Sequence, residues 1–211
     1  MKFVFLSDTH CKHGEIKIPD GDVFIFCGDM SSRGELSEIE SFSLFLQKLP
    51  HKNKIVIAGN HDFSFEDERK IEAENLIKAS GAVYLNDSGL QINGIKFWGS
   101  PIQPYFRNWA FQRQRGEEIK KHWDLIPLDT DVLITHGPPY GILDKTRRGE
   151  MVGCEELLKK VWEIKPKIHV FGHIHEGYGT IKQKDITFIN SSNLNFLYQY
   201  TNLPIEWEWQ S

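Results

Sequence analysis

The sequence has few cysteines, no long apolar run and no cluster of basic residues. Its 3 cysteines, at positions 11, 27 and 154, are odd in number and widely spaced. This argues against a disulfide framework and favours a reducing compartment, so we expect a cytoplasmic protein. The first apolar run, residues 3–6, is too short for a signal peptide or a membrane span, and no membrane contact is expected. The 25 basic and 29 acidic residues give a net charge of -4, which does not favour long nucleic acids as partners.

Internal repeats, linkers and low-complexity tracts are absent too, and the rest of the composition is that of a globular protein. Hydrophobic residues make up 40% of the 211 residues and charged residues 26%. A chain of this length buries roughly 70% of its unfolded surface, which is enough for one core. We therefore expect a single domain over residues 1–211. The number that stands out is the 9 histidines, because imidazole is the commonest metal ligand.

Short runs rich in Val, Ile and Phe alternate with helical patterns along the chain. Five such runs predict buried strands at residues 2–7, 23–27, 54–58, 131–135 and 168–171. Apolar residues at helical spacing predict helices at residues 35–48, 66–79 and 152–164. Two hairpins are predicted, one from residues 90–93 and 95–98 and one from 179–183 and 186–190. This alternation predicts an α/β protein with a mixed, two-sheet core and helices outside.

Oxygen and nitrogen donors follow the predicted strands at the points where they end. They are Asp8, His10, Asp29, Asn60, His61, His136, His173 and His175. In open α/β sheets ligands bind just beyond the carboxyl ends of the strands. Because this set lacks thiolates, it favours Mn, Fe, Zn or a similar divalent ion over a structural zinc site. Each motif alone could reflect turn chemistry, but five strand ends together indicate a metal site.

These motifs, D-x-H, G-D, G-N-H-D, T-H-G and G-H-x-H in this order, resemble those of the calcineurin-like metallophosphoesterase superfamily. The resemblance runs from Asp8 to His175. The stretches FWGSP, THGPP and GHIHEGYG are similar to the metallophosphoesterase-domain-containing branch, which is similar to class III cyclic nucleotide phosphodiesterases. The resemblance implies a four-layer αββα sandwich of two mixed β-sheets flanked by helices.

The resemblance also implies two divalent metal ions, with manganese as the first expectation and Fe, Zn, Mg or Ni as alternatives. It assigns Asp8, His10 and His175 to one ion. It assigns Asn60, His136 and His173 to the other, with Asp29 bridging the two. A pair of such ions would lower the pKa of a bridging water and clamp the phosphate oxygens during attack.

The residues that follow Asn60 are candidates for catalysis. His61 is adjacent to Asn60 and does not easily reach the same ion, so we expect it to stabilise or protonate the leaving oxygen. Asp62 either orients His61 or caps a helix start.

The loop GDMSSRG resembles that of Ser/Thr protein phosphatases, but Ser32 stands where those have an orienting aspartate. This departure argues against their mechanism, and Arg33 either contacts the phosphate or is a solvated loop residue.

Aromatic residues are concentrated between positions 98 and 111. Trp98, Tyr105 and Trp109, together with Asn60 and Arg33, are candidate substrate-binding residues, since aromatic rings stack on nucleobases. The alternative is a loop that packs onto the core through its own aromatic side chains.

The sequence thus predicts a metal-dependent phosphodiesterase for a small phosphodiester, a cyclic or other nucleotide, with attack by a metal-bridging hydroxide and assistance from His61. The alternatives are a phosphomonoesterase or a nuclease of the same fold, or a non-catalytic metal-binding scaffold. The acidic charge argues against the nuclease. The complete ligand set with His61 argues against the scaffold. The sequence does not indicate an oligomeric state.

Overall fold

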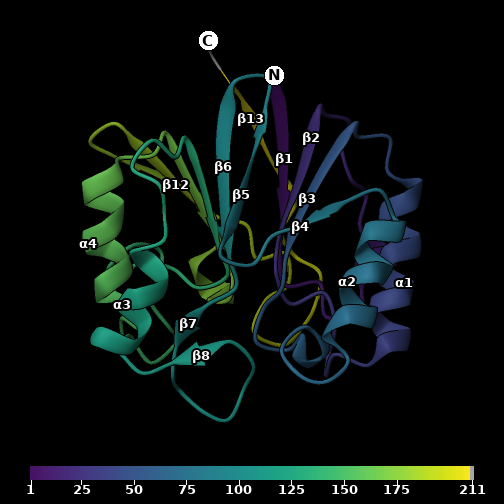
Figure 1. The fold of residues 1–211 in the computed structure, drawn as a ribbon, viewed down its shortest axis with the longest axis horizontal. Coiled ribbons are helices and arrows are strands. Elements are labelled where there is room, and N and C mark those ends of the chain that lie inside the picture. The colour runs from purple at the N-terminus through teal and green to yellow at the C-terminus, as the bar shows by residue number, and fades with distance from the viewer. Residues whose placement is uncertain (210–211) are drawn as a thin grey trace.

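Two mixed β-sheets lie face to face between two pairs of helices in the computed structural model, which describes residues 1–209 (Figure 1). Helices α1 (Leu36–Lys48) and α2 (Lys70–Ala79) cover one sheet. Helices α3 (Glu117–Trp123) and α4 (Glu155–Ile164) cover the other. The predicted four-layer αββα sandwich is therefore confirmed.

The first sheet has five strands in the order β13-β1-β2-β3-β4. Their bounds are Ile205–Glu208, Lys2–Leu6, Val23–Cys27, Asn53–Ile57 and Val83–Tyr84. Strands β1 to β4 are parallel, whereas β13 pairs antiparallel with β1. The carboxyl ends of β1, β2 and β3 consequently lie at one edge of the sheet.

The second sheet has six strands in the order β11-β12-β10-β9-β6-β5. Their bounds are Gly179–Gln183, Ile186–Asn190, Ile168–Phe171, Val132–Thr135, Ile95–Ser100 and Ser88–Ile92. The four central strands are parallel, and the two edge strands close antiparallel hairpins. Both predicted hairpins are thus confirmed. A separate small sheet pairs β7 (Gln103–Pro104) with β8 (Gln112–Arg113).

The apolar runs are continuous because the parallel strands are buried on both faces. In β1, Phe3 and Phe5 belong to the core between the two sheets, whereas Val4 and Leu6 belong to the core beneath the helices. All four side chains are fully buried. A strand with alternate residues in two different cores shows no polar face, and this is why its sequence reads as one apolar stretch.

Two of the predicted helices begin later than expected. Helix α2 starts at Lys70 rather than at residue 66, because Phe63–Phe65 forms a separate 3₁₀ helix, η2. Helix α4 starts at Glu155 instead of residue 152, with Cys154 as its N-cap. Two further 3₁₀ helices, η1 and η3, span His13–Glu15 and His175–Gly177.

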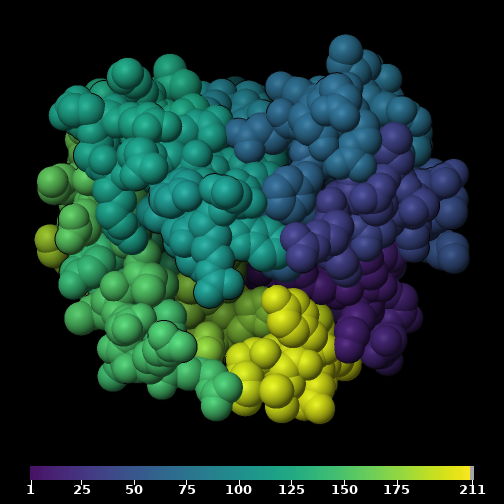
Figure 2. Space-filling model, turned by 90° about the horizontal axis from the view of Figure 1, so that it is seen from below, coloured from purple at the N-terminus to yellow at the C-terminus, as the bar shows by residue number. Residues whose placement is uncertain are grey.

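The edge at which the parallel strands end forms one face of the molecule. Viewed from this side, segments far apart in the sequence surround a hollow (Figure 2). They are the teal segment after β6, the green segment after β9 and the yellow segment near the C-terminus. Within residues 1–209, no helix combines the length and apolarity that crossing a membrane requires.

His169 on β10 is a buried histidine with a defined structural role. Its Nε2 lies 2.9 Å from the Thr135 hydroxyl, which itself donates to the carbonyl of Gly137. The Nε2–H therefore donates to Thr135, and Nδ1 has no partner among the described residues. Burial lowers the pKa of His169 to about 3, because a proton on Nδ1 would place an unpaired charge in the core.

His169 should therefore make stability depend on pH. The unfolded imidazole has a pKa near 6.5, so between about pH 3 and 6.5 the unfolded state binds more protons. The free energy of unfolding should therefore be highest above pH 6.5 and should decrease by about 1.4 kcal/mol for each pH unit below it. Urea unfolding at pH 7 and pH 5 measures this loss. The loss should be about 2 kcal/mol smaller in His169→Gln, whose amide can still donate to Thr135. Equal losses in the two proteins would refute this role.

Candidate functional site

The chain turns sharply where the strands end, and several of the predicted ligands occupy these turns. Asp8, Asp29 and His173 each lie two residues beyond a strand and have positive φ angles of 57°, 59° and 68°. His10 is also in this region, with φ at 40°. Non-glycine residues in this conformation cost free energy and tend to cluster at functional sites. The local backbone is thus bent to aim these side chains at a common point.

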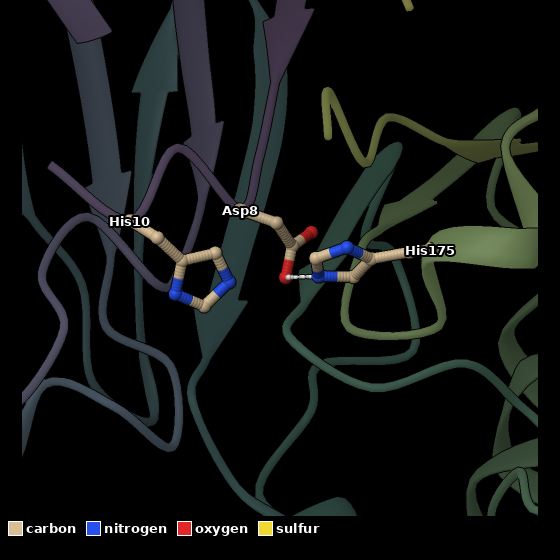
Figure 3. Close-up of side chains that lie close together, drawn as sticks. All are labelled: Asp8, His10 and His175. Atoms are coloured by element: carbon tan, nitrogen blue, oxygen red, sulfur yellow. Dashed lines mark ion pairs between the residues drawn. The ribbon is translucent and has the colours of Figure 1, made fainter. Parts of the chain in front are cut away.

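The structure brings the predicted ligands together in three overlapping groups. In each group the potential ligand atoms all lie within 4.8 Å of one another. The first group is Asp8, His10 and His175, in which His175 Nε2 lies 3.7 Å from Asp8 Oδ1 (Figure 3). The other two groups are Asp29, His136 and His173, and His10, Asp29 and His61. Asp29 belongs to both of these groups, as a ligand shared by two ions would have to.

Asn60 completes the cluster on the side of His136. The His136 Nε2 lies 3.1 Å from Asn60 Oδ1 and 3.4 Å from Asp29 Oδ2. The same Asp29 oxygen lies 3.8 Å from His10 Nε2 and 4.0 Å from His61 Nε2. A single carboxylate oxygen therefore faces three imidazoles, which is an arrangement that a shared ligand between two cations requires.

Backbone carbonyl oxygens hold three of the histidines in one orientation. The Nδ1 atoms of His136, His61 and His175 lie 2.8, 2.8 and 3.0 Å from the carbonyls of Cys27, Ser32 and Asn195. Because a carbonyl only accepts, each Nδ1 carries the proton and each Nε2 faces the cluster. Metal-binding histidines are commonly held by such outer hydrogen bonds.

The donor atoms fit divalent cations. His10 is buried, yet neither of its ring nitrogens has a hydrogen-bond partner among the described residues. Asp8 is fully buried and accepts from the His173 backbone and the Ser192 hydroxyl. Buried polar atoms without partners are costly, and a cation bound here would satisfy them. Histidine nitrogens and carboxylate oxygens suit Mn, Fe and Zn.

Burial and neighbouring charges set the protonation of the cluster. Burial works against the charged forms of Asp8 and Asp29, but the adjacent histidines outweigh it and keep both pKa values below the usual range. Burial lowers the pKa of His10 to about 4 and that of His173 to about 3. His136 differs, since its burial is outweighed by the Asp29 carboxylate, which raises its pKa to about 9. The two carboxylates and the neutral His10 and His173 are thus in their metal-binding forms.

Two of the motifs contain glycines at positions where the backbone passes too close to a predicted ligand for any side chain to fit. A Cβ atom on Gly59 would lie 2.2 Å from Asp29 Oδ1 and 2.6 Å from His136 Cε1. A Cβ atom on Gly172 would lie 2.3 Å from Asp8 Oδ2. Both glycines therefore let the backbone of one motif pass directly against a ligand of another.

Gly59→Ala should disrupt both the fold and the ligand cluster. The added methyl group cannot fit without moving Asp29, and overpacking of this kind costs about 3 kcal/mol. Gly14→Ala is a matched control, because nothing lies within 4 Å of a Cβ atom built there; it should change stability by less than about 0.5 kcal/mol. Chemical denaturation and metal analysis of both variants test this. Equal stability and metal content would rule it out.

Asp62 occupies the N-cap position of η2, one of the two places expected from the sequence, but its side chain binds elsewhere. Its fully buried carboxylate accepts hydrogen bonds from the backbone N–H groups of Gly59, Asp29 and Ser31, at 2.8, 2.9 and 3.0 Å. It makes no capping bond to η2, and among the described residues the His61 Nδ1 lies against Ser32 O. Asp62 thus ties the loop that carries Asp29 to the loop that carries Asn60.

Residues of the cluster line a cavity of about 680 Å³. Trp109 lines it, and its ring lies 4.3 Å from that of His61. Arg33 lies over this aromatic ring, 4.9 Å from the Trp109 ring centre. Trp109 therefore lies next to His61 and lines the cavity, whereas Arg33 contacts Trp109 but is not among the lining residues.

Trp98 and Tyr105 do not line this cavity. Trp98 is on β6, where the alternation of the strand places it opposite Leu133 and against the core beneath the helices. Tyr105 is exposed, and its hydroxyl donates to Asn108. The structure thus gives Trp98 a packing role and leaves Tyr105 on the surface, and neither lies where substrate contact was expected. Phe106 lines the cavity in their place.

The segment that follows β12 contributes to the site and was not predicted from the sequence. Ser192 donates to Asp8 at 2.8 Å, and the carbonyl of Asn195 holds His175. Tyr198 packs against His10, with 4.7 Å between their ring centres. Polar residues of this segment come directly after a buried strand, which is the same signal that identified the other ligands.

Comparisons with known proteins agree with this geometry. Residues 1–177 match the family of calcineurin-like phosphoesterases. Metallophosphoesterase domain-containing protein 1 of Homo sapiens is 40% identical over 226 residues, which cover 97% of this chain and 69% of that protein. A UPF0046 protein of Caenorhabditis elegans is 42% identical over 211 residues, covering 91% and 75%. The crystal structure of TT1561 of Thermus thermophilus has a TM-score of 0.58 at 11% identity, over 90% of this chain and 88% of that one, a similarity of fold alone.

Proposed function

Because the chain belongs to the calcineurin-like phosphoesterase family, we propose that it hydrolyses a small phosphodiester, such as a cyclic nucleotide, with two divalent metal ions. The observation that carries this proposal is the convergence of the ligand groups around Asp29, with His61 beside them in an open cavity. Asp8, His10 and His175 would hold one ion. Asn60, His136 and His173 would hold the other, and Asp29 both.

The chemistry that such ions supply is acidification of a water molecule and neutralisation of phosphate charge. Manganese is the first expectation for a set of carboxylate, amide and imidazole ligands without thiolate. Backbone carbonyls hold His136 and His175 through Nδ1, so their Nε2 atoms would already face the bound ions.

His61 is positioned to move a proton. Its Nδ1 is occupied by the carbonyl of Ser32, so the nitrogen available to the cavity is Nε2. The Asp29 carboxylate oxygen lies 4.0 Å from this Nε2. A proton on Nε2 would pass to the leaving oxygen as its bond to phosphorus breaks, which avoids the release of a free alkoxide.

Turnover of bis-p-nitrophenyl phosphate and p-nitrophenyl phosphate with Mn²⁺ tests the proposal. We expect the diester to be hydrolysed with at least a tenfold higher kcat/KM, and activity to disappear after treatment with EDTA. A panel of 2′,3′- and 3′,5′-cyclic nucleotides then identifies the base and ring preference. A preference for the monoester would contradict the diester assignment. Bound metal without turnover of any ester would instead favour a scaffold.

A further inference from the structure

Arginine side chains gather in the same cavity as the predicted metal ligands. Four arginines line it, namely Arg107, Arg115, Arg147 and Arg148. Arg115 is occupied, since its guanidinium donates to the carbonyls of Val152 and Gly153 at 2.8 Å each. Within residues 1–209, the guanidinium groups of the other three have no hydrogen bond or ion pair. On a chain of net charge -4, free cations gathered at one cavity indicate an anionic ligand.

Arg147 is held in place without using its hydrogen-bond donors. Its guanidinium carbon lies 3.7 Å from the centre of the Phe196 ring, and its backbone N–H donates to Glu176 at 3.3 Å. A guanidinium that stacks through its flat face leaves its edge free to bind two oxygens of a phosphate. Arg147 is thus arranged to receive an oxyanion from the cavity.

Arg148 is next to it at the tip of the same turn. The turn is closed by hydrogen bonds from the Thr146 N–H to the Glu150 carbonyl and from the Gly149 N–H to the Thr146 carbonyl, at 2.9 and 2.8 Å. Arg148 is exposed and lines the cavity. Adjacent arginines on a closed turn repel each other, and a shared anion removes this repulsion.

Arg147 contacts Phe196 and Glu176, neither of which is a predicted metal ligand. The turn that carries the two arginines follows β9, whereas Phe196 comes from the segment after β12 (Figure 2). A cavity of about 680 Å³ has the size of sites that hold a whole small molecule. There is room for a second phosphate beyond the one to be cleaved.

We propose that the substrate carries a second phosphate, which Arg147 and Arg148 bind at the rim of the cavity. The substrate class is thereby narrowed to small phosphoesters with two phosphate groups, such as a nucleotide diester with a further phosphate on its sugar. This inference rests on the proposed function for the identity of the first phosphate. Glu150 and Glu176 also line the cavity, and the Glu176 carboxylate lies against the Arg147 backbone. Their negative charge opposes an anion at this place, and the free guanidinium groups would have to outweigh it.

Calorimetric titration with thymidine 3′,5′-bisphosphate and thymidine 5′-monophosphate tests this in the presence of Mn²⁺. The two ligands differ only in the second phosphate. Wild type should bind the bisphosphate at least tenfold more tightly, which is about 1.4 kcal/mol. The preference should fall below about threefold in Arg147→Gln/Arg148→Gln. It should persist in Lys70→Gln/Lys78→Gln, which removes the same charge from exposed positions on α2.

Equal affinity of wild type for the two nucleotides, or no measurable binding of the bisphosphate, would overturn the inference. A preference that survives in the double arginine variant would overturn it as well, since the metal centre would then account for it. Turnover of bis-p-nitrophenyl phosphate by the same samples is scored separately. A preference for the bisphosphate without any turnover would refute the proposed function and leave the second phosphate site standing.

Discussion

Replacing His61 by alanine should lower kcat for an alkyl phosphodiester by about 10²–10⁴ while leaving the metal content unchanged. This is the usual contribution of a general acid. The substitution removes the only imidazole of the cavity that is both partly exposed and unassigned to an ion. The metal content should remain unchanged because His61, although it lies in a group with His10 and Asp29, is not one of the residues assigned to either ion.

The dependence on the leaving group distinguishes a proton donor from a merely structural residue. A p-nitrophenolate leaves without protonation, so His61→Ala should slow its release far less than the release of an alkoxide. Measuring kcat for both kinds of diester, in wild type and variant, gives this comparison. His122→Ala serves as the control, since His122 pairs with Asp87 and does not line the cavity. Equal losses on both esters would remove the general-acid role.

Replacing Asp29 by asparagine should abolish the binding of at least one metal ion and nearly all turnover. The asparagine retains an oxygen for the His61 backbone N–H, which donates to Asp29 Oδ1 at 2.8 Å. What it loses is the charge that faces His10, His61 and His136. Two dications near one another repel strongly without that charge. Even outer partners of metal ligands contribute about 10–100-fold to affinity, so loss of this ligand should exceed about 100-fold.

Elemental analysis after dialysis against limiting Mn²⁺ measures this effect directly. Wild type should retain two ions per chain, and Asp29→Asn one or none. Asp185→Asn is a suitable control, because it removes a charge from the exposed turn between β11 and β12. Two ions retained by Asp29→Asn would show that the carboxylate is not shared between them.

The elements that carry the ligands were predictable from sequence because their signal is local. Each is a short buried strand followed closely by a polar residue, as with Phe171 before His173. Elements with weak local signals were missed. Helix α3 is seven residues long and buries only Ile119 and Trp123. Strand β13 has every residue partly or fully exposed, so its sequence shows no buried face.

The role of Asp62 shows what a local pattern cannot contain. Its carboxylate binds the backbone of residues 29–31, which are 31 to 33 positions away in sequence and adjacent to it only after folding. The sequence around Asp62 indicated an N-cap or a partner for His61, and both of these roles depend only on neighbours along the chain. Trp98 illustrates the same limit. The sequence of its strand shows alternate residues on two faces, but not that the face with Trp98 packs against the core beneath the helices.

The ligands divide between the two sheets, and this has a consequence for how the protein folds. Asp8, Asp29 and Asn60 follow strands of the five-stranded sheet, whereas His136 and His173 follow strands of the six-stranded sheet. Neither sheet alone holds a complete set, so the site forms only when the sheets dock through their common apolar core. By thermodynamic linkage, ions that bind the docked form also stabilise the docking itself. The apolar contacts between the sheets, far from any ligand, are therefore part of what sets the affinity for metal.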